Sequence, residues 1–178
     1  MENLSLGKKE PVVISIVATK SGSGKTTLIE KLIKIFKAKN FSVGVLKHDA
    51  HKFDIDKEGK DSYRFSQAGA DNVIISSSEK LAMVQILREE KKLEDIIKLF
   101  GDLDLIIIEG FKNNNYPKIE VHRRGVNEDF LCNNLNFNIE SFIAVASDEA
   151  LNIDIPVLDL NDANSIADFI ENRFLIRR

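Results

Sequence analysis

Cysteine is almost absent from this sequence, because Cys132 is the only one among 178 residues. An internal disulfide is therefore impossible, which is typical of a protein in the reducing cytoplasm. The sequence also lacks any apolar run close to the roughly 20 residues needed to span a bilayer. Residues 1–10 are polar and charged and contain no apolar core of a signal peptide. We therefore expect a cytoplasmic protein with no membrane partner.

A strong charge of either sign is missing as well. Lys and Arg number 25 against 28 Asp and Glu, a net charge of −3, so no overall field attracts nucleic acid or an anionic membrane. This balance predicts no nucleic-acid partner, although it is compatible with a local basic pocket. The sequence contains no internal repeat and no interdomain linker, so residues 1–178 are expected to form a single domain.

Short apolar, β-branched runs alternate with amphipathic segments along the chain. The runs predict strands over 11–18, 41–46, 103–108, 118–122, 141–146 and 155–158, and the amphipathic segments predict helices over 26–39, 61–69, 91–100 and 162–174. Two more strands, 71–76 and 81–87, follow one another directly and indicate a strand-rich insertion over 71–90. The alternation predicts an α/β fold, a mostly parallel sheet with helices on both faces. Ligands of such folds bind at the carboxyl ends of the strands.

The first predicted strand is followed by Thr19-Lys20-Ser21-Gly22-Ser23-Gly24-Lys25-Thr26-Thr27 and then by a helix. A strand, a glycine-rich turn and a helix in that order predict a phosphate loop (P-loop). Its glycines let consecutive backbone N–H groups face an anion, and the helix dipole adds positive charge there. Lys25 is expected to reach the β- and γ-phosphates of a nucleoside triphosphate, and Thr26 to bind Mg²⁺. The predicted nucleotide-binding residues of this loop are Ser21, Gly22, Ser23, Gly24, Lys25, Thr26 and Thr27.

Two positions depart from the common loop. The common pattern has Gly six residues before its lysine, where this chain has Thr19, so the backbone angle at residue 19 is an open question. Lys20 stands where partition-type ATPases have a lysine that reaches the nucleotide of a dimer partner. Those proteins have Gly at the position of Ser21, so a solvated surface lysine remains the alternative.

A carboxylate is expected near the magnesium ion, because phosphoryl chemistry uses one at the end of a neighbouring buried strand. Glu109 follows the most apolar predicted strand of the chain and is followed by Gly110, where the chain can leave the sheet tightly. We therefore predict that Glu109 binds Mg²⁺ and acts in catalysis together with Lys25. Asp104 lies at the other end of the same strand and is expected to be a cap or turn residue.

The segment 47–60 is polar, and a loop of this length inside a compact domain more often has a function than not. We predict a switch-like loop in which Lys47 and His48 approach phosphate and Asp54 or Asp56 approaches Mg²⁺. A zinc site is the weaker alternative, because no third soft ligand stands near the two histidines of this loop. An ordinary solvated charged loop is the other alternative.

These motifs resemble the molybdopterin-guanine dinucleotide biosynthesis protein B (MobB) family, a branch of the phosphate-loop GTPases related to signal-recognition and partition proteins (SIMIBI-like). The resemblance rests on three segments: 21–27, the Lys47-His48 to Ser62 region with Arg64 and Ala68-Gly69-Ala70, and Glu109-Gly110-Phe111-Lys112. The middle segment is the most specific, because phosphate loops at large lack it. It departs from the family at Ala50, which replaces a histidine, and at Glu58, where proline is common. The change at Ala50 weakens a metal-binding role for this loop.

The resemblance implies a GTP-binding protein with weak, Mg²⁺-dependent GTPase activity and a homodimeric assembly. It implies a role in attaching GMP to molybdopterin, with molybdopterin or its guanine dinucleotide and a partner nucleotidyltransferase, the molybdenum cofactor guanylyltransferase, as partners. Pairing of exposed strand edges over residues 73–87 is one way in which the dimer could form.

Guanine recognition needs a separate argument, because the usual Asn-Lys-x-Asp motif is absent. Asp148 follows a predicted strand at the corresponding place, and its carboxylate can accept both hydrogen bonds of the guanine N1 and N2 edge. An ordinary loop acid is the alternative. Two other functions also remain open: an adaptor that binds a nucleotide or molybdopterin without required hydrolysis, and a small-molecule kinase that uses ATP.

Overall fold

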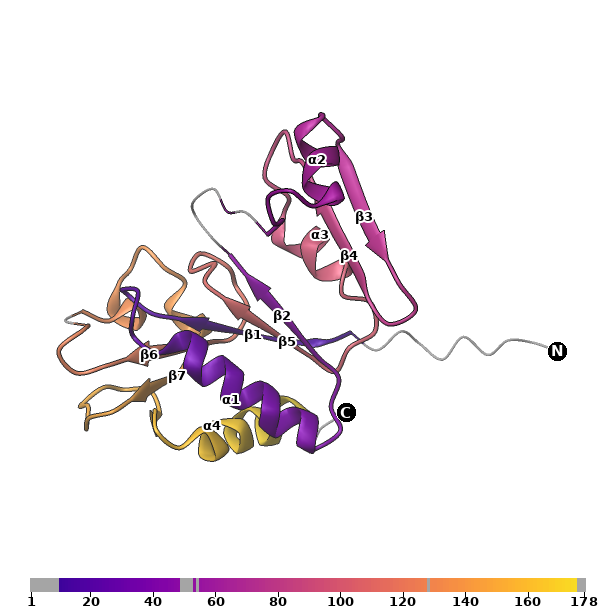
Figure 1. Cartoon of the computed structure of the whole chain (residues 1–178). Coiled ribbons are helices and arrows are strands. Elements are labelled where there is room, and N and C mark those ends of the chain that lie inside the picture. Colours follow the sequence, from indigo (N-terminus) through magenta and orange to yellow (C-terminus); the bar gives the residue numbers. More distant parts are fainter. Residues whose placement is uncertain (1–9, 49–52, 54, 128, 176–178) are drawn as a thin grey trace. The chain divides into compact units, whose positions relative to one another are not determined.

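The computed structural model describes residues 10–48, 53, 55–127 and 129–175 (Figure 1). The chain divides into two compact units, which we describe separately. The first, here called the sheet unit, consists of Met1–His48 and Leu99–Arg178. The second, the hairpin unit, is Asp49–Lys98 and is inserted into the first along the sequence.

The sheet unit is built on a six-stranded sheet in the order β2-β5-β1-β6-β7-β8. All neighbouring pairs are parallel, which confirms the predicted α/β class. The strands are β1 Val12–Val17, β2 Val43–Lys47, β5 Leu105–Glu109, β6 Lys118–His122, β7 Phe142–Ser147 and β8 Val157–Asp159. Because the strands are parallel, the segments after β1, β2, β5, β6 and β7 all begin at one edge of the sheet.

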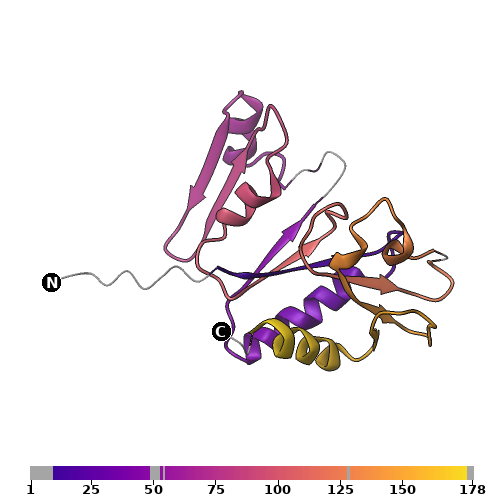
Figure 2. The same cartoon turned by 180° about the vertical axis from the view of Figure 1, so that it is seen from behind.

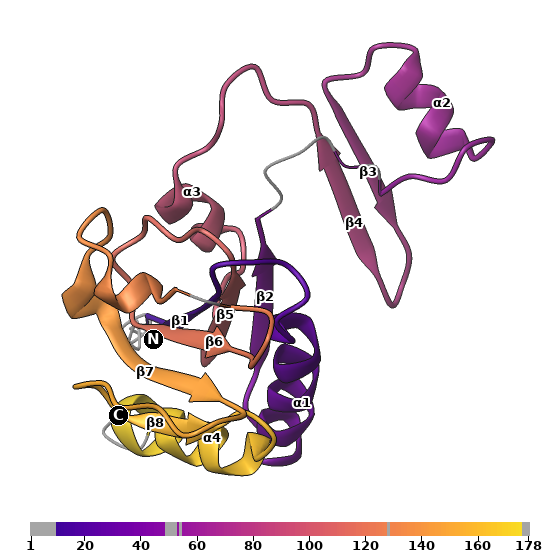
Figure 3. The same ribbon diagram turned by 90° about the vertical axis from the view of Figure 1, so that its left-hand side faces the viewer.

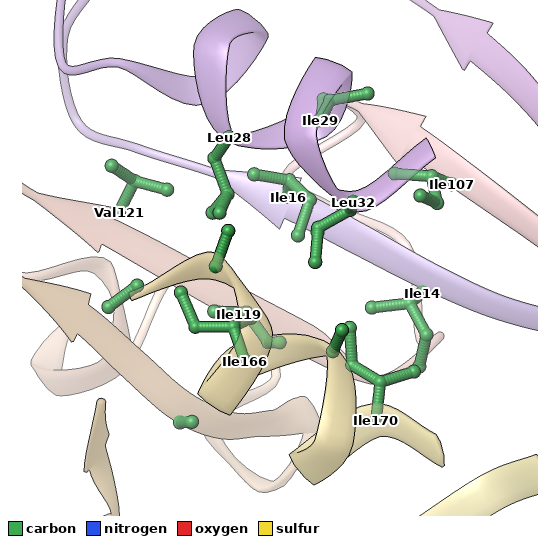
Figure 4. Packing of buried hydrophobic residues seen from close by; sticks show 14 of the residues in the cluster. Ile14, Ile16, Leu28, Ile29, Leu32, Ile107, Ile119, Val121, Ile166 and Ile170 are labelled. Atoms are coloured by element: carbon green, nitrogen blue, oxygen red, sulfur yellow. The ribbon is translucent and has the colours of Figure 1, made fainter. Parts of the chain in front are cut away.

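One face of the sheet is covered by α1, Lys25–Ala38, and α4, Ala163–Ile170 (Figure 3). The buried side chains of α1 recur at helical spacing and pack on Ile14, Ile16 and Ile107 of the central strands (Figure 4); they are Leu28, Ile29, Leu32 and Phe36. Helix α4 begins at Asp162, whose Oδ1 accepts hydrogen bonds from the backbone N–H groups of Asn164 and Ser165, both at 3.1 Å. It continues into a π-helical turn, η3, Glu171–Leu175.

The opposite face is covered by the segment between β6 and β7, drawn in orange in Figure 2. This segment contains two short 3-10 helices, η1 Leu131–Asn133 and η2 Ile139–Ser141. Glu120 is buried beneath it, and its carboxylate accepts hydrogen bonds from the N–H groups of Leu131 at 2.8 Å and Cys132 at 2.9 Å. Burial raises the pKa of Glu120. The two backbone hydrogen bonds act in the opposite direction, because they stabilise the charged carboxylate.

The hairpin unit contains α2 Asp61–Gln67, β3 Asn72–Ser76, β4 Leu81–Gln85 and α3 Leu93–Lys98. Strands β3 and β4 pair antiparallel as a separate two-stranded sheet. Both predicted strands of the 71–90 segment are therefore present, and the compact unit around them is larger than that segment. Whether residues 1–178 function as one domain stays a prediction. No helix of the described residues is long and apolar enough to cross a membrane.

The predicted and observed elements differ mainly at their ends. A strand was expected from Phe41, but β2 begins at Val43, because Asn40 turns the chain with a φ of 64° and Phe41 packs edge-on against Phe36 at 5.9 Å. Strands β2 and β5 each run one residue further than predicted, to Lys47 and Glu109, since these two residues are paired across the sheet. The predicted helix 91–100 is shorter, Leu93–Lys98.

Candidate functional site

The segment between β1 and α1 forms a compact loop at the carboxyl edge of the sheet. Gly22 and Gly24 have φ angles of 76° and 98°, which side-chain-bearing residues rarely adopt. Ser23 is buried, and its hydroxyl donates to the Lys20 carbonyl oxygen at 2.8 Å. In this described segment no side chain caps α1 and no acidic residue lies in its first turn. The N–H groups and the positive helix end can therefore serve an anion.

Thr19, which replaces the usual glycine, has an ordinary backbone conformation. Among the described residues, the only non-glycine residues with positive φ are Asn40 and Phe111. The Thr19 hydroxyl accepts a hydrogen bond from Asn127 Nδ2 at 2.5 Å, and its carbonyl accepts one from Lys112 Nζ at 3.2 Å. The threonine thus supplies a side-chain contact that a glycine cannot make, and the open question about residue 19 is answered.

Thr26 and Glu109 lie in direct contact at the start of α1 and the end of β5. The Thr26 hydroxyl lies 3.2 Å and 3.3 Å from the two carboxylate oxygens of Glu109. The parallel pairing of β1 with β5 produces this proximity, since it aligns Ile16 with Glu109. A hydroxyl and a carboxylate are hard oxygen donors of the kind that Mg²⁺ prefers, and Mg²⁺ in such sites keeps water and phosphate as its other ligands. The donor set therefore fits the predicted ion.

Three lysines give the site its positive charge. Lys25 donates to the Lys20 carbonyl oxygen at 3.3 Å. Burial lowers the pKa of Lys25, the nearby Glu109 carboxylate raises it, and the charges of Lys112 and Lys47 lower it further. The charges of Lys47 and Lys112 therefore both act on Lys25, and such a concentration of positive charge is expected of a site that binds a polyanion.

The turn after β5 is held in an unusual conformation. Gly110 and Phe111 have consecutive positive φ angles, 94° and 50°, and such strain in a bulky residue tends to occur at functional sites. The His48 N–H donates to the Glu109 carbonyl oxygen at 3.0 Å. The His48 ring lies on the Phe111 ring with the centroids 3.9 Å apart. Together these contacts fix the end of β2 beside the end of β5, where Glu109 lies.

Asp148 lies at the same edge, directly after β7. It is exposed, and its Oδ1 accepts a hydrogen bond from the Arg124 N–H at 2.8 Å. The Ser147 hydroxyl closes the turn by accepting from the Glu149 N–H at 3.1 Å. In the strand order β1-β6-β7, Asp148 is two strands away from the phosphate loop. A base-reading role for Asp148 stays a prediction.

For Asp54 and Asp56, the role of magnesium ligand stays a prediction. Asp54 lies outside the described residues. Asp56 belongs to the hairpin unit, where its Oδ1 accepts a hydrogen bond from the Ser62 hydroxyl at 2.7 Å. Within the described parts of the chain, no group of three or more His, Cys, Asp or Glu side chains gathers as a metal site. The zinc alternative stays untested, because His51, one of its two histidines, lies outside the described residues.

Sequence reasoning missed three side chains that contact the loop: Lys112, Arg123 and Asn127. Lys112 and Asn127 bind Thr19, and Arg123 Nε donates to the Ser23 carbonyl oxygen at 3.3 Å. Arg123 directly follows β6, so the rule that polar residues after parallel strands meet at one edge would have found it. Asn127 carries no comparable signal.

Comparison with known proteins adds to this geometry. The family model described as "Molybdopterin guanine dinucleotide synthesis protein B", MobB, matches residues 13–148. The chain belongs to the MobB family. The matched span contains the phosphate loop, Glu109, Arg123 and Asp148.

Curated relatives of this MobB-family chain match most of its length. The molybdopterin-guanine dinucleotide biosynthesis adapter protein of Haemophilus influenzae is 41% identical over 154 residues, which cover 85% of this chain and 84% of the relative. The protein of the same name from Escherichia coli is 37% identical over 173 residues, covering 91% and 93%. A crystal structure of molybdopterin-guanine biosynthesis protein B has a TM-score of 0.70 at 28% identity and covers 91% of this chain and 99% of that one. The MobB fold therefore extends over both units of the chain.

Proposed function

We propose that this protein binds GTP with Mg²⁺, hydrolyses it slowly, and assists the synthesis of molybdopterin guanine dinucleotide in the cytoplasm. Membership of the MobB family supports the pathway, and so do the printed names of relatives that are 41% and 37% identical. Its partners in this proposal are molybdopterin or its guanine dinucleotide and the nucleotidyltransferase that joins GMP to molybdopterin.

The observation that carries the proposal is the contact between Thr26 and Glu109 beside Lys25. Thr26 and Glu109 would hold Mg²⁺, which would neutralise charge on the phosphates. Lys25 would bind the β- and γ-phosphates, and the N–H groups of residues 21–27 would bind the remaining phosphate oxygens.

Slow hydrolysis follows from what this chain can supply. Water attacks the γ-phosphorus, the bond to the β–γ bridging oxygen breaks, and GDP and inorganic phosphate leave. The protein contributes mainly position and positive charge to this reaction. Glu109 would also orient water, and its role as a magnesium ligand limits how well it can serve as a base.

Guanine preference is assigned to Asp148. Its Oδ1 is oriented by the Arg124 N–H, and a carboxylate has further lone pairs that can accept hydrogen bonds from guanine N1 and N2. Adenine presents no such pair of donors. An Asp148→Asn variant should therefore lose most of its preference for GTP over ATP while it keeps its affinity for the triphosphate.

Calorimetry with GTP and ATP, each with and without Mg²⁺, tests the proposal. We expect GTP to bind, Mg²⁺ to strengthen the binding, and Lys25→Ala to abolish it. Glu109→Gln should bind GTP equally with and without Mg²⁺, whereas Glu94→Gln, at an exposed position of α3, should behave like the wild type. Micromolar GTP affinity in Lys25→Ala would refute the assigned role of the loop. ATP preference with substrate-dependent turnover would indicate a small-molecule kinase.

A second candidate function is that of an adaptor for which hydrolysis is not required. The word adapter in the names of the curated relatives supports it. A Glu109→Gln variant that binds GTP but does not hydrolyse it separates the two functions. If this variant restores molybdenum-cofactor maturation in a strain without the native protein, hydrolysis is dispensable; if it fails while binding is intact, hydrolysis is required.

A homodimer is part of the proposal, and the hairpin unit supports it. Ile74, Ile75, Leu81 and Met83 are exposed by 60%, 51%, 68% and 47% on the two-stranded β3-β4 sheet. Exposed apolar side chains on a strand edge favour association with another chain. Sedimentation should therefore report a dimer for the wild type and a monomer for Ile74→Lys with Met83→Lys. A dimeric double variant would refute this surface as the interface.

A further inference from the structure

The turn that follows β6 contacts the outer side of the phosphate loop. The Val126 and Asn127 N–H groups donate to the Arg123 carbonyl oxygen at 3.0 Å and 3.1 Å, and Asn127 Oδ1 accepts from the Arg123 N–H at 3.0 Å. Asn127 is 6% exposed, and its Nδ2 donates to the Thr19 hydroxyl at 2.5 Å. Residues 123–127 thus form a closed turn that is tied to the first residue of the loop.

The guanidinium group of Arg123 lies against the loop at its other end. Its Nε donates to the Ser23 carbonyl oxygen at 3.3 Å. A Cβ atom placed on Gly24 would lie 3.0 Å from Arg123 Nη2 and 3.7 Å from Cζ. The charged group therefore packs closely on the residue directly before Lys25.

The charge of Arg123 is not neutralised by a described carboxylate. The ion pairs among the described residues include its neighbour Arg124, with Glu149 at 3.8 Å, but none of them involves Arg123. A half-buried positive charge that has no described carboxylate as partner would act through space on an anion bound at the loop, and burial makes screening by solvent less effective.

We propose that Arg123 is a positioning residue that adds a further fixed positive charge to the phosphate loop, and that Asn127 holds the turn that places it there. The proposal rests on the proposed function, since it assumes that nucleotide phosphates bind this loop. Arg123 acts through its charge, from its place beside Ser23 and Gly24, and is not a direct ligand of the phosphates. Its contribution should grow with the negative charge of the ligand, so it favours a triphosphate over a diphosphate and a diphosphate over a monophosphate.

Three variants separate the effect of the Arg123 charge from the effect of the Asn127 contact that fixes its position. Arg123→Gln removes the charge and Arg123→Lys keeps it. Asn127→Ser keeps the charge as well but removes the amide that fixes the turn carrying Arg123. Arg173→Gln is the matched control, because Arg173 is an exposed arginine of η3 and is not part of the candidate site. The measurements are the affinities for GMP, GDP and GTP at low and high salt, with thermal unfolding of each variant.

Arg123→Gln should lose about tenfold in affinity for GTP, less for GDP and least for GMP, as expected for a charge acting over several ångströms in a partly buried site. Its affinity for GTP should also depend less on salt than that of the wild type. Arg123→Lys should recover most of the loss, and Arg173→Gln should show none. Asn127→Ser should show losses in the same order as Arg123→Gln but smaller ones, because the charge is kept and only its position is no longer fixed.

An equal loss for the three nucleotides in Arg123→Gln, or no loss, overturns the proposal while GTP binding by the wild type leaves the proposed function intact. If Arg123→Gln unfolds, the comparison of Arg123→Lys with the wild type decides: a lysine variant that has lost the preference for GTP over GMP overturns it. Absence of GTP binding in the wild type overturns the proposed function itself and this inference with it.

Discussion

Lys118 offers a quantitative test of the core, because a buried lysine changes stability with pH in a calculable way. It is the first residue of β6 and is completely buried. Its Nζ donates to the Asn114 carbonyl oxygen, to the Tyr116 carbonyl oxygen at 3.4 Å and to the Ser141 hydroxyl at 2.6 Å. Burial lowers the pKa of Lys118 from 10.5 to about 8.

The sign of the effect follows from proton binding. Between about pH 8 and pH 10.5 the unfolded chain keeps its proton on this lysine while the folded chain releases it. The free energy of unfolding therefore rises with pH in this window. Since one pH unit corresponds to about 1.4 kcal/mol, the whole window corresponds to about 3 kcal/mol of stability.

The perturbation is Lys118→Met, which keeps an unbranched stem and removes the titrating group. Urea unfolding of both proteins from pH 7 to pH 10.5 gives the measurement, and the difference between them removes the contribution of all other groups. The wild type should gain about 3 kcal/mol relative to the variant over this range. Lys34→Met, on the exposed side of α1, is the control and should show no such gain. A constant difference between the wild type and Lys118→Met would refute the reasoning.

Three further predictions concern the sheet unit. Leu32→Ala should lower the free energy of unfolding by about 3 kcal/mol, because Leu32 of α1 is fully buried against the sheet. Urea titration measures this loss, and a loss below about 1 kcal/mol would contradict the packing. Asp162→Ala should cost about 1 kcal/mol, since it removes both N-cap hydrogen bonds of α4, whereas Asp162→Asn should cost much less in the same titration. Gly24→Ala should lower GTP affinity more than tenfold in calorimetry, because a φ of 98° is strained for alanine and its Cβ would press on the Arg123 guanidinium group at 3.0 Å; wild-type affinity would show that the loop adopts another conformation.

The candidate site could be predicted where its residues are marked by local pattern. Gly22, Gly24, Lys25 and Thr26 stand in one short segment between an apolar run and an amphipathic helix, so strand, loop and helix follow from neighbouring residues alone. Glu109 could be added because it ends the most apolar strand. The structure brings Glu109 to Thr26, and the parallel pairing of β1 with β5 is the reason.

Residues without such a pattern could not be predicted. Arg123 and Asn127 are separated from their partners in the loop by 100 and 108 positions. No periodicity or spacing connects residues so far apart, since their contact exists only after β6 has paired with β1. The role of Thr19 could not be predicted either, because the hydrogen bond from Asn127 to its hydroxyl joins two distant segments.

By itself, the sequence determined the fold class and the position of the glycine-rich loop between the first strand and the first helix. These follow from interactions between residues that are neighbours in the chain: the burial of apolar runs, the freedom of glycine and the start of a helix. Only the tertiary structure decided which distant side chains complete the loop. Strand order places β6 beside β1, and that order results from the packing of the whole sheet. The Arg123 charge beside Gly24 is therefore a property of the folded sheet and of no single segment.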